Sequence, residues 1–276
     1  MSLAQPLTRR LHRRRASWRL ALPKVTRRSW AVWLHDFWSW RTYYKSSVLL
    51  NFGEPMMGLI ALGWGLGAYV SQIGELNFLQ FIAPGLLAVT AMNAVTFDTC
   101  FEGYDKLRRS GTYTAMTSTS MEVEELVGGA ILWESTRSLL YGVIYLTVLL
   151  AAGLLQSWWS LAILGTLILS GVLFTLMALV VVSRAKVHEQ LFYYVTLVIT
   201  PMFMFSGVFF PVERLPAAAQ WLVQLLPLYH MVELNRAFAL GQVHSGLLLH
   251  VGALGLMIAA VAPFPARMLR RALESL

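Results

Sequence analysis

The sequence predicts an all-α polytopic membrane protein. We expect six transmembrane helices, an N-terminal amphipathic interface helix and a re-entrant helical hairpin between the fifth and sixth spans. Of the 276 residues, 57% are hydrophobic and only 13% are charged, whereas a soluble domain carries about 25% charged residues. The chain contains apolar stretches close to the roughly 20 residues that cross a bilayer. Lys and Arg gather on alternate connecting segments, as in multi-pass proteins.

Composition also excludes several kinds of chemistry. The single cysteine, Cys100, excludes an intrachain disulfide framework and a multi-cysteine metal site. The sequence has no Gly-Lys dipeptide and therefore no phosphate-binding loop, and it has no G-x-S-x-G or H-E-x-x-H motif. We therefore expect no catalytic residue, no metal site and no cofactor in this chain. Energy for any work must come from a partner or an ion gradient.

The N-terminal part divides into two segments. Residues 1–28 form a basic tail, which we expect to be cytoplasmic and to lie on anionic membrane lipid, where each basic residue contributes roughly 1 kcal/mol. Residues 29–276 form the transmembrane domain. It starts with a helix over 29–45 whose aromatic side chains recur at steps of three and four: Trp30, Trp33, Phe37, Trp40 and Tyr44. Such a stripe favours a helix lying in the membrane interface; packing of the stripe in a core is the alternative.

The expected spans follow in order, and the basic residues orient them. The spans cover about 48–70, 79–97, 126–150, 160–182, 191–210 and 247–263. Nineteen of the 22 Lys and Arg residues lie in the terminal segments and in the second and fourth connections, and two lie in the remaining connections. The positive-inside rule then places both termini in the cytoplasm. The net charge of +8 is explained by this distribution, so we expect no nucleic-acid partner.

Three ionisable residues fall inside the expected spans: Glu54, Glu134 and Arg137. Intramembrane charges are costly and need partners. Glu134 and Arg137 are three residues apart and share a helix face, and a lateral pair of Glu54 with Arg137 is geometrically possible. The three side chains either line the inner mouth of a substrate path or hold spans together. A proton relay is a third possibility.

The most irregular stretch lies around the fifth span. Pro201 interrupts it, Ser206 and Gly207 loosen it, and Pro211 ends it. A hairpin over 211–228 follows, too short to cross the bilayer again. Irregular backbone survives at membrane depth only where protein or a water-filled path satisfies its polar groups. The pattern is therefore typical of a re-entrant element on the outer side.

Three motifs carry a family resemblance: F-I-A-P-G-L-L-A at 81–88, P-M-F-M-F-S-G-V-F-F-P-V-E-R-L-P at 201–216 and L-P-L-Y-H-M-V-E-L-N-R-A-F-A-L-G at 226–241. With the Glu54-Pro55 pair, they resemble the type-2 ABC exporter permeases. Within these, the chain is most similar to the nodulation protein J family of lipo-oligosaccharide exporter permeases. The resemblance covers nearly the whole chain from about Trp30. The basic tail is longer than the family core requires.

The resemblance implies a permease that pairs with a second copy of itself and with two copies of a separate ATPase, which binds ATP and Mg. It implies an inner-membrane protein exporting an amphiphilic lipid or saccharide. The 98–125 loop would be the coupling helix that docks on the ATPase, through Glu102, Tyr104, Lys106, Leu107, Arg108 and Arg109. The substrate path and outer gate would involve Glu54, Glu134, Arg137, Pro201, Phe205, Ser206, Gly207 and Pro211.

Other interpretations stay open from the sequence alone. The 98–125 loop is otherwise a solvated charged loop without a fixed partner. A multidrug exporter permease has a closely related sequence. A lipid-modifying membrane enzyme would need convergent polar residues at one membrane face, and Glu213, His230, Glu233 and Arg236 lie close together in the sequence on the expected outer side. A proton-driven secondary transporter is the last alternative, although no inverted repeat supports it.

Overall fold

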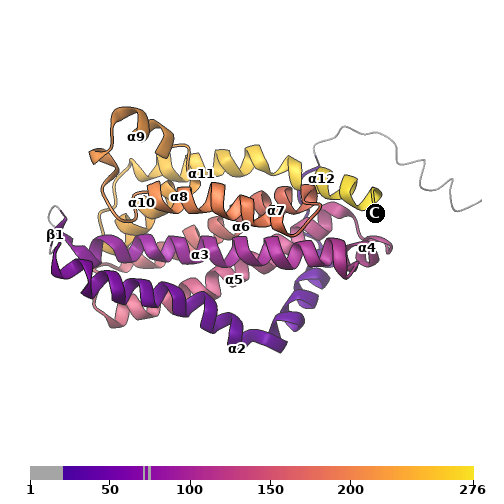
Figure 1. The fold of residues 1–276 in the computed structure, drawn as a ribbon, viewed down its shortest axis with the longest axis horizontal. Helices are drawn as coiled ribbons and strands as arrows, with labels where there is room; N and C mark the ends of the chain where they lie inside the picture. Colours follow the sequence, from indigo (N-terminus) through magenta and orange to yellow (C-terminus); the bar gives the residue numbers. More distant parts are fainter. Residues whose placement is uncertain (1–20, 71, 74–75) are drawn as a thin grey trace, which may run out of the picture.

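The computed structural model describes residues 21–70, 72–73 and 76–276. Most of the expected basic tail lies outside these residues. The long helices run side by side along one direction (Figure 1). They are α2 (Arg27–Trp64), α3 (Phe78–Tyr104), α5 (Val123–Ala151), α6 (Ile163–Arg184), α11 (Leu247–Val261) and α12 (Pro263–Glu274). The bundle therefore has two ends, and the function of the protein depends on what each end presents.

The two ends differ in content. At the end that we call the basic end lie the π-helical turn η2 (Asp105–Arg109), the short helix α4 (Thr112–Thr117) and α12. At the opposite end, the hairpin end, a two-stranded antiparallel hairpin pairs β1 (Gln72–Ile73) with β2 (Leu76–Asn77). The hairpin end also carries the 3-10 turn η5 (Val212–Arg214) and α9 (Ala217–Val223), followed by α10 (Pro227–Leu240).

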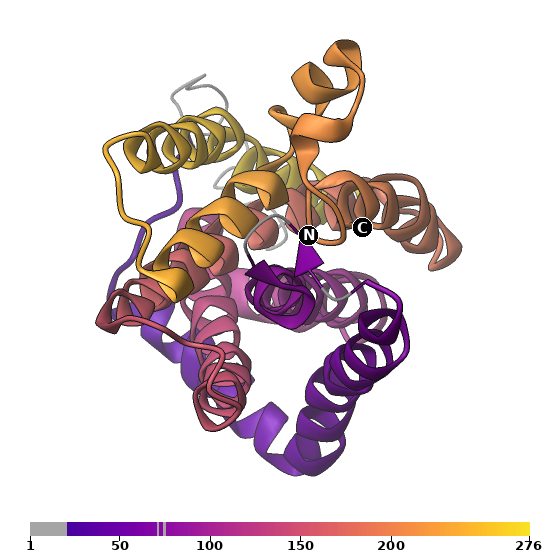
Figure 2. The same ribbon diagram turned by 90° about the vertical axis from the view of Figure 1, so that its left-hand side faces the viewer.

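Helix α3 runs through the middle of the bundle. It contacts α2, α5, α6 and α10, and Figure 2 shows it surrounded by the other helices. Every residue from Phe81 to Met92 is buried, so α3 has no exposed face over more than two consecutive turns. A helix that is apolar all round belongs in a core or a membrane, and α3 forms the common wall against which the other elements pack.

Among the described residues, three helical stretches are long and apolar enough to cross a membrane: Phe78–Arg109, Trp158–Arg184 and Leu247–Glu274. The other expected spans are less uniform. Helix α5 carries Glu134 and Arg137 in its interior, and the fifth expected span is divided into shorter helices. The helical, membrane-spanning class is confirmed, and the number of six spans stays a prediction.

The expected interface helix and the first span are joined in one helix, α2. It starts at a capping box, in which the Thr26 side chain accepts a hydrogen bond from the Ser29 backbone and the Ser29 side chain accepts one from the Thr26 backbone. A kink at Tyr43 (φ −126°, ψ 17°) separates its two parts, and the first part runs obliquely to the bundle (Figure 1). No proline or glycine lies at this bend, so helix-breaking residues do not predict its position.

The start of α2 is clamped to the start of α5. Lys24 N donates to Glu124 O at 2.9 Å, and Ser29 Oγ donates to Glu125 O at 2.8 Å. Gly128 makes this approach possible, because a Cβ atom there would lie 2.0 Å from Lys24 O. The interface part of α2 is therefore held in a defined place at the basic end.

The fifth expected span is irregular, as the sequence indicated. Helix α7 (Glu189–Tyr194) passes into the π-helical turn η4 (Val195–Ile199) and then α8 (Thr200–Phe205). Gly207 follows with φ 76°, a conformation that glycine adopts without strain. Arg236 Nη2 donates to Gly207 O at 2.8 Å, so a side chain from α10 satisfies the irregular backbone.

Candidate functional site at the basic end

Arg137 is the centre of a buried polar network. Its side chain is fully buried, and its guanidinium forms an ion pair with Asp98 of α3. Arg137 Nη2 also donates to Ser47 Oγ of α2 at 3.2 Å, and Ser47 Oγ lies 2.7 Å from Tyr141 Oη of α5. The network therefore ties α2, α3 and α5 together just beyond the kink.

A second network lies closer to the basic end. Lys106 Nζ of η2 lies 2.7 Å from Asp36 Oδ1 of α2 and 3.1 Å from Glu102 Oε1 of α3. Tyr43 Oη, at the kink, donates to Glu102 Oε2 at 3.2 Å. Lys106 and Asp36 are 9% and 3% exposed. The interface part of α2 is thus linked by buried charges to the end of the α3 helix.

The other two predicted intramembrane charges are Glu134 and Glu54. Glu134 is buried, and its Oε2 atom has no hydrogen-bond partner among the described residues. The side chain of Glu54, in α2, lies outside the described residues, so the predicted pair of Glu54 with Arg137 stays a prediction. The partner that Arg137 has in the structure is Asp98, which lies one residue beyond the predicted end of the second span at residue 97.

The aromatic stripe of α2 packs on one residue of α5. The Trp133 ring lies 6.0, 6.2 and 6.1 Å from the rings of Trp33, Phe37 and Trp40, in edge-on geometry. Trp30 stacks on Trp33 at 4.3 Å and is 51% exposed, so the start of the stripe is only partly covered. The arrangement combines features of the two interpretations, core packing and an interface helix. The stripe packs on the bundle at its centre and presents aromatic surface at its start.

The predicted coupling residues divide into buried and exposed sets. Leu107 is 1% exposed, and Tyr104 Oη donates to Lys186 O of the next basic-end connection at 3.0 Å. With Lys106 buried as well, these residues face the bundle. Arg108 is half-buried, and Arg109 is exposed beside Asp105 at 3.5 Å.

Helix α4 adds an exposed face to Arg109. Thr114, Ala115 and Ser118 are exposed, whereas Tyr113 is buried. Arg109 together with Thr114, Ala115 and Ser118 forms what we call the α4 face. No charge or motif in the sequence marks these α4 residues. The available signal is Gly111, which starts α4 in the left-handed conformation with φ 66°.

The predicted gate residues lie together toward the hairpin end. Pro201 and Phe205 are exposed on α8, with Phe205 at 50%. Ser206 is buried, and its hydroxyl donates to Met202 O. Gly207 and Pro211 bound the irregular segment that leads to η5. These residues form the least regular part of the expected fifth span.

The polar residues proposed as an enzyme site are engaged with the fold. Arg236 Nη1 lies 2.7 Å from Glu233 Oε1, and Arg236 Nε donates to Phe81 O at 3.3 Å. His230 Nε2 lies 2.9 Å from Gln224 O, and its Nδ1 lies 2.9 Å from His250 Nδ1. These contacts hold α10 to α3, α9 and α11. Among the described residues, no group of three His, Cys, Asp or Glu side chains is placed to hold a metal ion.

His230 gives the structure a pH dependence. Burial lowers the pKa of His230 from its ordinary 6.5, and the hydrogen bond to Gln224 only partly opposes this. The unfolded chain takes up the proton more readily, so this contribution to stability is complete above pH 6.5 and is lost as the pH falls through the folded-state value. Thermal unfolding between pH 7.5 and 5 should therefore depend less on pH in His230→Gln than in the wild type. His244→Gln, at an exposed position, is the control, and an unchanged pH profile in His230→Gln contradicts this assignment.

Comparison with known proteins identifies the chain. Residues 28–240 match the family model described as ABC-2 type transporter. This chain belongs to the ABC-2 type transporter family. Nodulation protein J of Rhizobium meliloti (strain 1021) is 34% identical over 90% of this chain and 95% of its own. Nodulation protein J of Neorhizobium galegae is 35% identical over 88% of this chain and 92% of its own.

A further relative points to the same activity. The inner membrane transport permease YadH of Escherichia coli (strain K12) is 28% identical over 73% of this chain and 78% of its own. The ABC-2 chain is therefore a transmembrane permease subunit of an ABC exporter. It is not an enzyme: its family partners with an ABC ATPase, which is a separate subunit. The family resemblance seen in the sequence motifs is confirmed.

Proposed function

We propose that two copies of this permease assemble with two copies of an ABC ATPase and move an amphiphilic glycolipid or lipo-oligosaccharide outward across the inner membrane. The observation that carries the proposal is the pairing of an exposed α4 face with buried links behind it. Arg109 and α4 face solvent, while Lys106, one turn away, is ion-paired to α2 and α3. A partner that docks on the α4 face can therefore act on both helices.

The orientation follows from charge. The basic end carries the connections rich in Lys and Arg, and we place it in the cytoplasm with both termini by the positive-inside rule. The α9–α10 hairpin then lies on the outer side, and we assign it as re-entrant. This places the α4 face where a cytoplasmic ATPase can reach it. ATP and Mg bind the ATPase, and this chain contributes no group to them.

The coupling route runs from the α4 face in two directions. Lys106 joins η2 to Asp36 of α2, and the Tyr104 hydroxyl joins α3 to the connection before α7 at Lys186. ATP binding moves the equilibrium between inward-open and outward-open states only if the closed ATPase binds one of them better. We assign the buried contacts as the elements that differ between these states.

The substrate path uses the irregular fifth span. Pro201, Phe205, Ser206, Gly207 and Pro211 form its outer gate in this proposal, because a helix broken by a π-helical turn and a positive-φ glycine changes shape at low cost. We assign Arg137 a structural role, because Asp98, Ser47 and Tyr141 all contact its Nη2 atom. Glu134 and Glu54 are the charges we assign to the inner mouth.

The test is affinity purification of the tagged chain from its native membrane in mild detergent and in nanodiscs. We expect a stoichiometric ATPase with a phosphate-binding loop, at two ATPase chains per two permease chains. Hydrolysis of ATP by this complex should rise on addition of the exported amphiphile. Glycolipids and lipo-oligosaccharides are compared with hydrophobic drugs, since stimulation by drugs alone favours a multidrug exporter. Absence of any ATPase in both preparations contradicts the proposal.

A charge reversal on the α4 face should release the ATPase. Arg109→Glu combined with Ala115→Arg changes charge and bulk at two exposed positions, and we expect at least a tenfold loss of co-purified ATPase, equivalent to about 1.4 kcal/mol. The exposed Arg109–Asp105 pair contributes little to folding, at about 0–1 kcal/mol. The amount of folded permease should therefore stay the same.

The matched control is Arg271→Glu, at an exposed position of α12 at the same end. It makes the same arginine-to-glutamate reversal as Arg109→Glu, away from the α4 face. Equal retention of ATPase in the α4-face variant and in the control argues that the ATPase docks elsewhere.

A further inference from the structure

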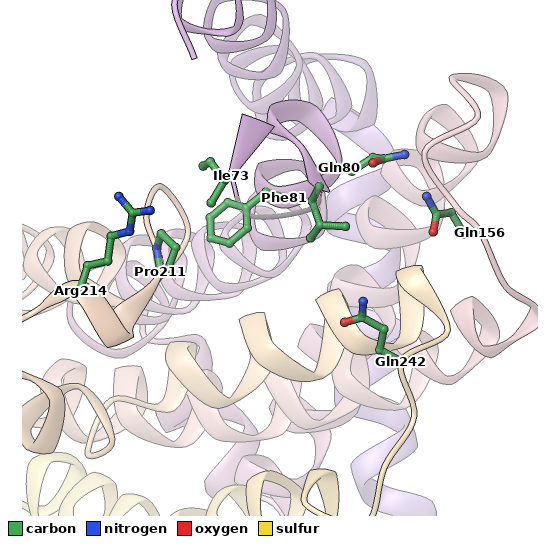
Figure 3. A pocket seen from close by; sticks show the side chains of 8 residues that line it. Ile73, Gln80, Phe81, Gln156, Pro211, Arg214 and Gln242 are labelled. Atoms are coloured by element: carbon green, nitrogen blue, oxygen red, sulfur yellow. The ribbon is translucent and has the colours of Figure 1, made fainter. Parts of the chain in front are cut away.

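A hollow of about 570 Å³ opens at the hairpin end of the chain. Five separate segments line it: the β hairpin, the start of α3, the connection after α5, η5 with the residue before it, and the turn after α10 (Figure 3). We call it the outer hollow. Its size lies within the range of about 300–1,000 Å³ that small-molecule sites occupy. None of the residues assigned to the ATPase contact or the inner mouth lines it.

The floor of the outer hollow is a fixed aromatic ring. Phe81 is 5% exposed, and the guanidinium carbon of Arg236 lies 3.9 Å from the centre of its ring. Arg236 is itself held by Phe81 O, by Gly207 O and by the Glu233 carboxylate. The ring is therefore held in place before any ligand arrives, and a preformed surface of this kind lowers the entropy cost of binding.

The rim of the outer hollow is polar and has free hydrogen-bonding capacity. Gln80, Gln156, Gln242 and Arg214 point around the opening in Figure 3. Among the described residues, the side chains of Gln156, Gln242 and Arg214 make no hydrogen bond or ion pair. Gln80 Oε1 accepts from Asn77 N at 3.2 Å, which leaves its amide donors free. Three amides and one guanidinium thus surround an aromatic floor.

This combination matches one class of ligand chemistry. Side-chain amides both donate and accept, which suits neighbouring hydroxyl groups. A guanidinium binds a carboxylate or sulfate in a bidentate manner. A purely apolar ligand would gain no hydrogen bond from these rim groups.

We infer that the outer hollow binds an acidic saccharide head group, with Arg214 on its anionic group and the glutamine amides on its hydroxyls, above the Phe81 floor. The inference rests on the proposed function in one respect, namely that the hairpin end faces outward. The hollow then receives the head group of the exported amphiphile on the exit side. Each protomer has its own hollow, so the site requires no second copy.

The test measures binding of soluble saccharides to the full chain in nanodiscs of zwitterionic lipid, without ATPase. The probes are tetragalacturonic acid and the neutral maltotetraose, with inorganic phosphate as a further anion. We expect saturation-transfer NMR and calorimetry to give affinity for the acidic tetrasaccharide about tenfold above that for the neutral one. Arg214→Gln should remove most of this difference, and Gln156→Ala with Gln242→Ala should weaken both saccharides.

The matched control is Arg271→Gln on α12, at the opposite end of the bundle, which should bind as the wild type does. All variants should keep the wild-type unfolding temperature, because the changed side chains are exposed and have no described partner. Equal affinity of wild type and Arg214→Gln, absence of saccharide binding, or phosphate binding as tight as that of the saccharide overturns the inference. These outcomes are independent of ATPase co-purification, so the failure of the proposed function is recognised separately.

Discussion

Replacing Arg137 by alanine should lower the free energy of unfolding by about 3–5 kcal/mol, because removing one partner of a buried ion pair leaves the other charge uncompensated. In this protein the change leaves the Asp98 carboxylate without its cation and leaves Ser47 and Tyr141 without the donor that joins them to it. The neighbouring Glu134 carboxyl already has an unpaired oxygen. The contact between α2, α3 and α5 should therefore loosen as a unit.

The measurement is equilibrium unfolding in detergent, followed by tryptophan fluorescence. Arg184→Ala, at an exposed position near the end of α6, controls for loss of an arginine and should stay within about 0.5 kcal/mol of the wild type. Adding Asp98→Asn to Arg137→Ala should recover part of the loss, since it removes the unpaired charge. Wild-type stability in Arg137→Ala would show that Asp98 is adequately solvated without its partner.

Asp98 and Asp36 are paired in ways that the sequence alone does not predict. The sequence singles out Arg137, because a charge inside an apolar span needs a partner. Asp98 sits one residue beyond the expected end of the second span, where hydropathy falls, although α3 continues as helix to Tyr104. Asp36 lies on what the aromatic periodicity marks as the polar face of α2, yet it is 3% exposed because Lys106 folds over it.

Other features can be predicted from the sequence. Proline and glycine positions predicted the broken fifth span, and the structure has its π-helical turn and positive-φ Gly207 there. The outer hollow was not predictable, because its glutamines and Arg214 come from segments far apart in the sequence. Local patterns specify periodicity and breaks, whereas meeting points between distant segments depend on the packing of the bundle.

Replacing Lys106 by methionine should give the second large effect, a loss of about 3–5 kcal/mol of unfolding free energy. Methionine retains the length of the apolar stem but leaves the Asp36 and Glu102 carboxylates facing each other without the ammonium group. The two carboxylates come from α2 and α3, so their repulsion should separate the interface part of α2 from the end of α3. The measurement is the same unfolding experiment, with Lys45→Met, at an exposed position of α2, as the control.

Lys106→Met also separates coupling from docking. Lys106 is buried behind the α4 face, so the ATPase should still co-purify with any folded variant, while transport per ATP hydrolysed should fall. The double variant Lys106→Met with Asp36→Asn removes the charge left on α2 and should regain part of the stability. It should regain little of the transport, because the link between η2 and α2 is still absent. If the stabilised double variant transports as well as the wild type, the ion pair is a structural contact only, and the force from the ATPase must reach α2 by another route.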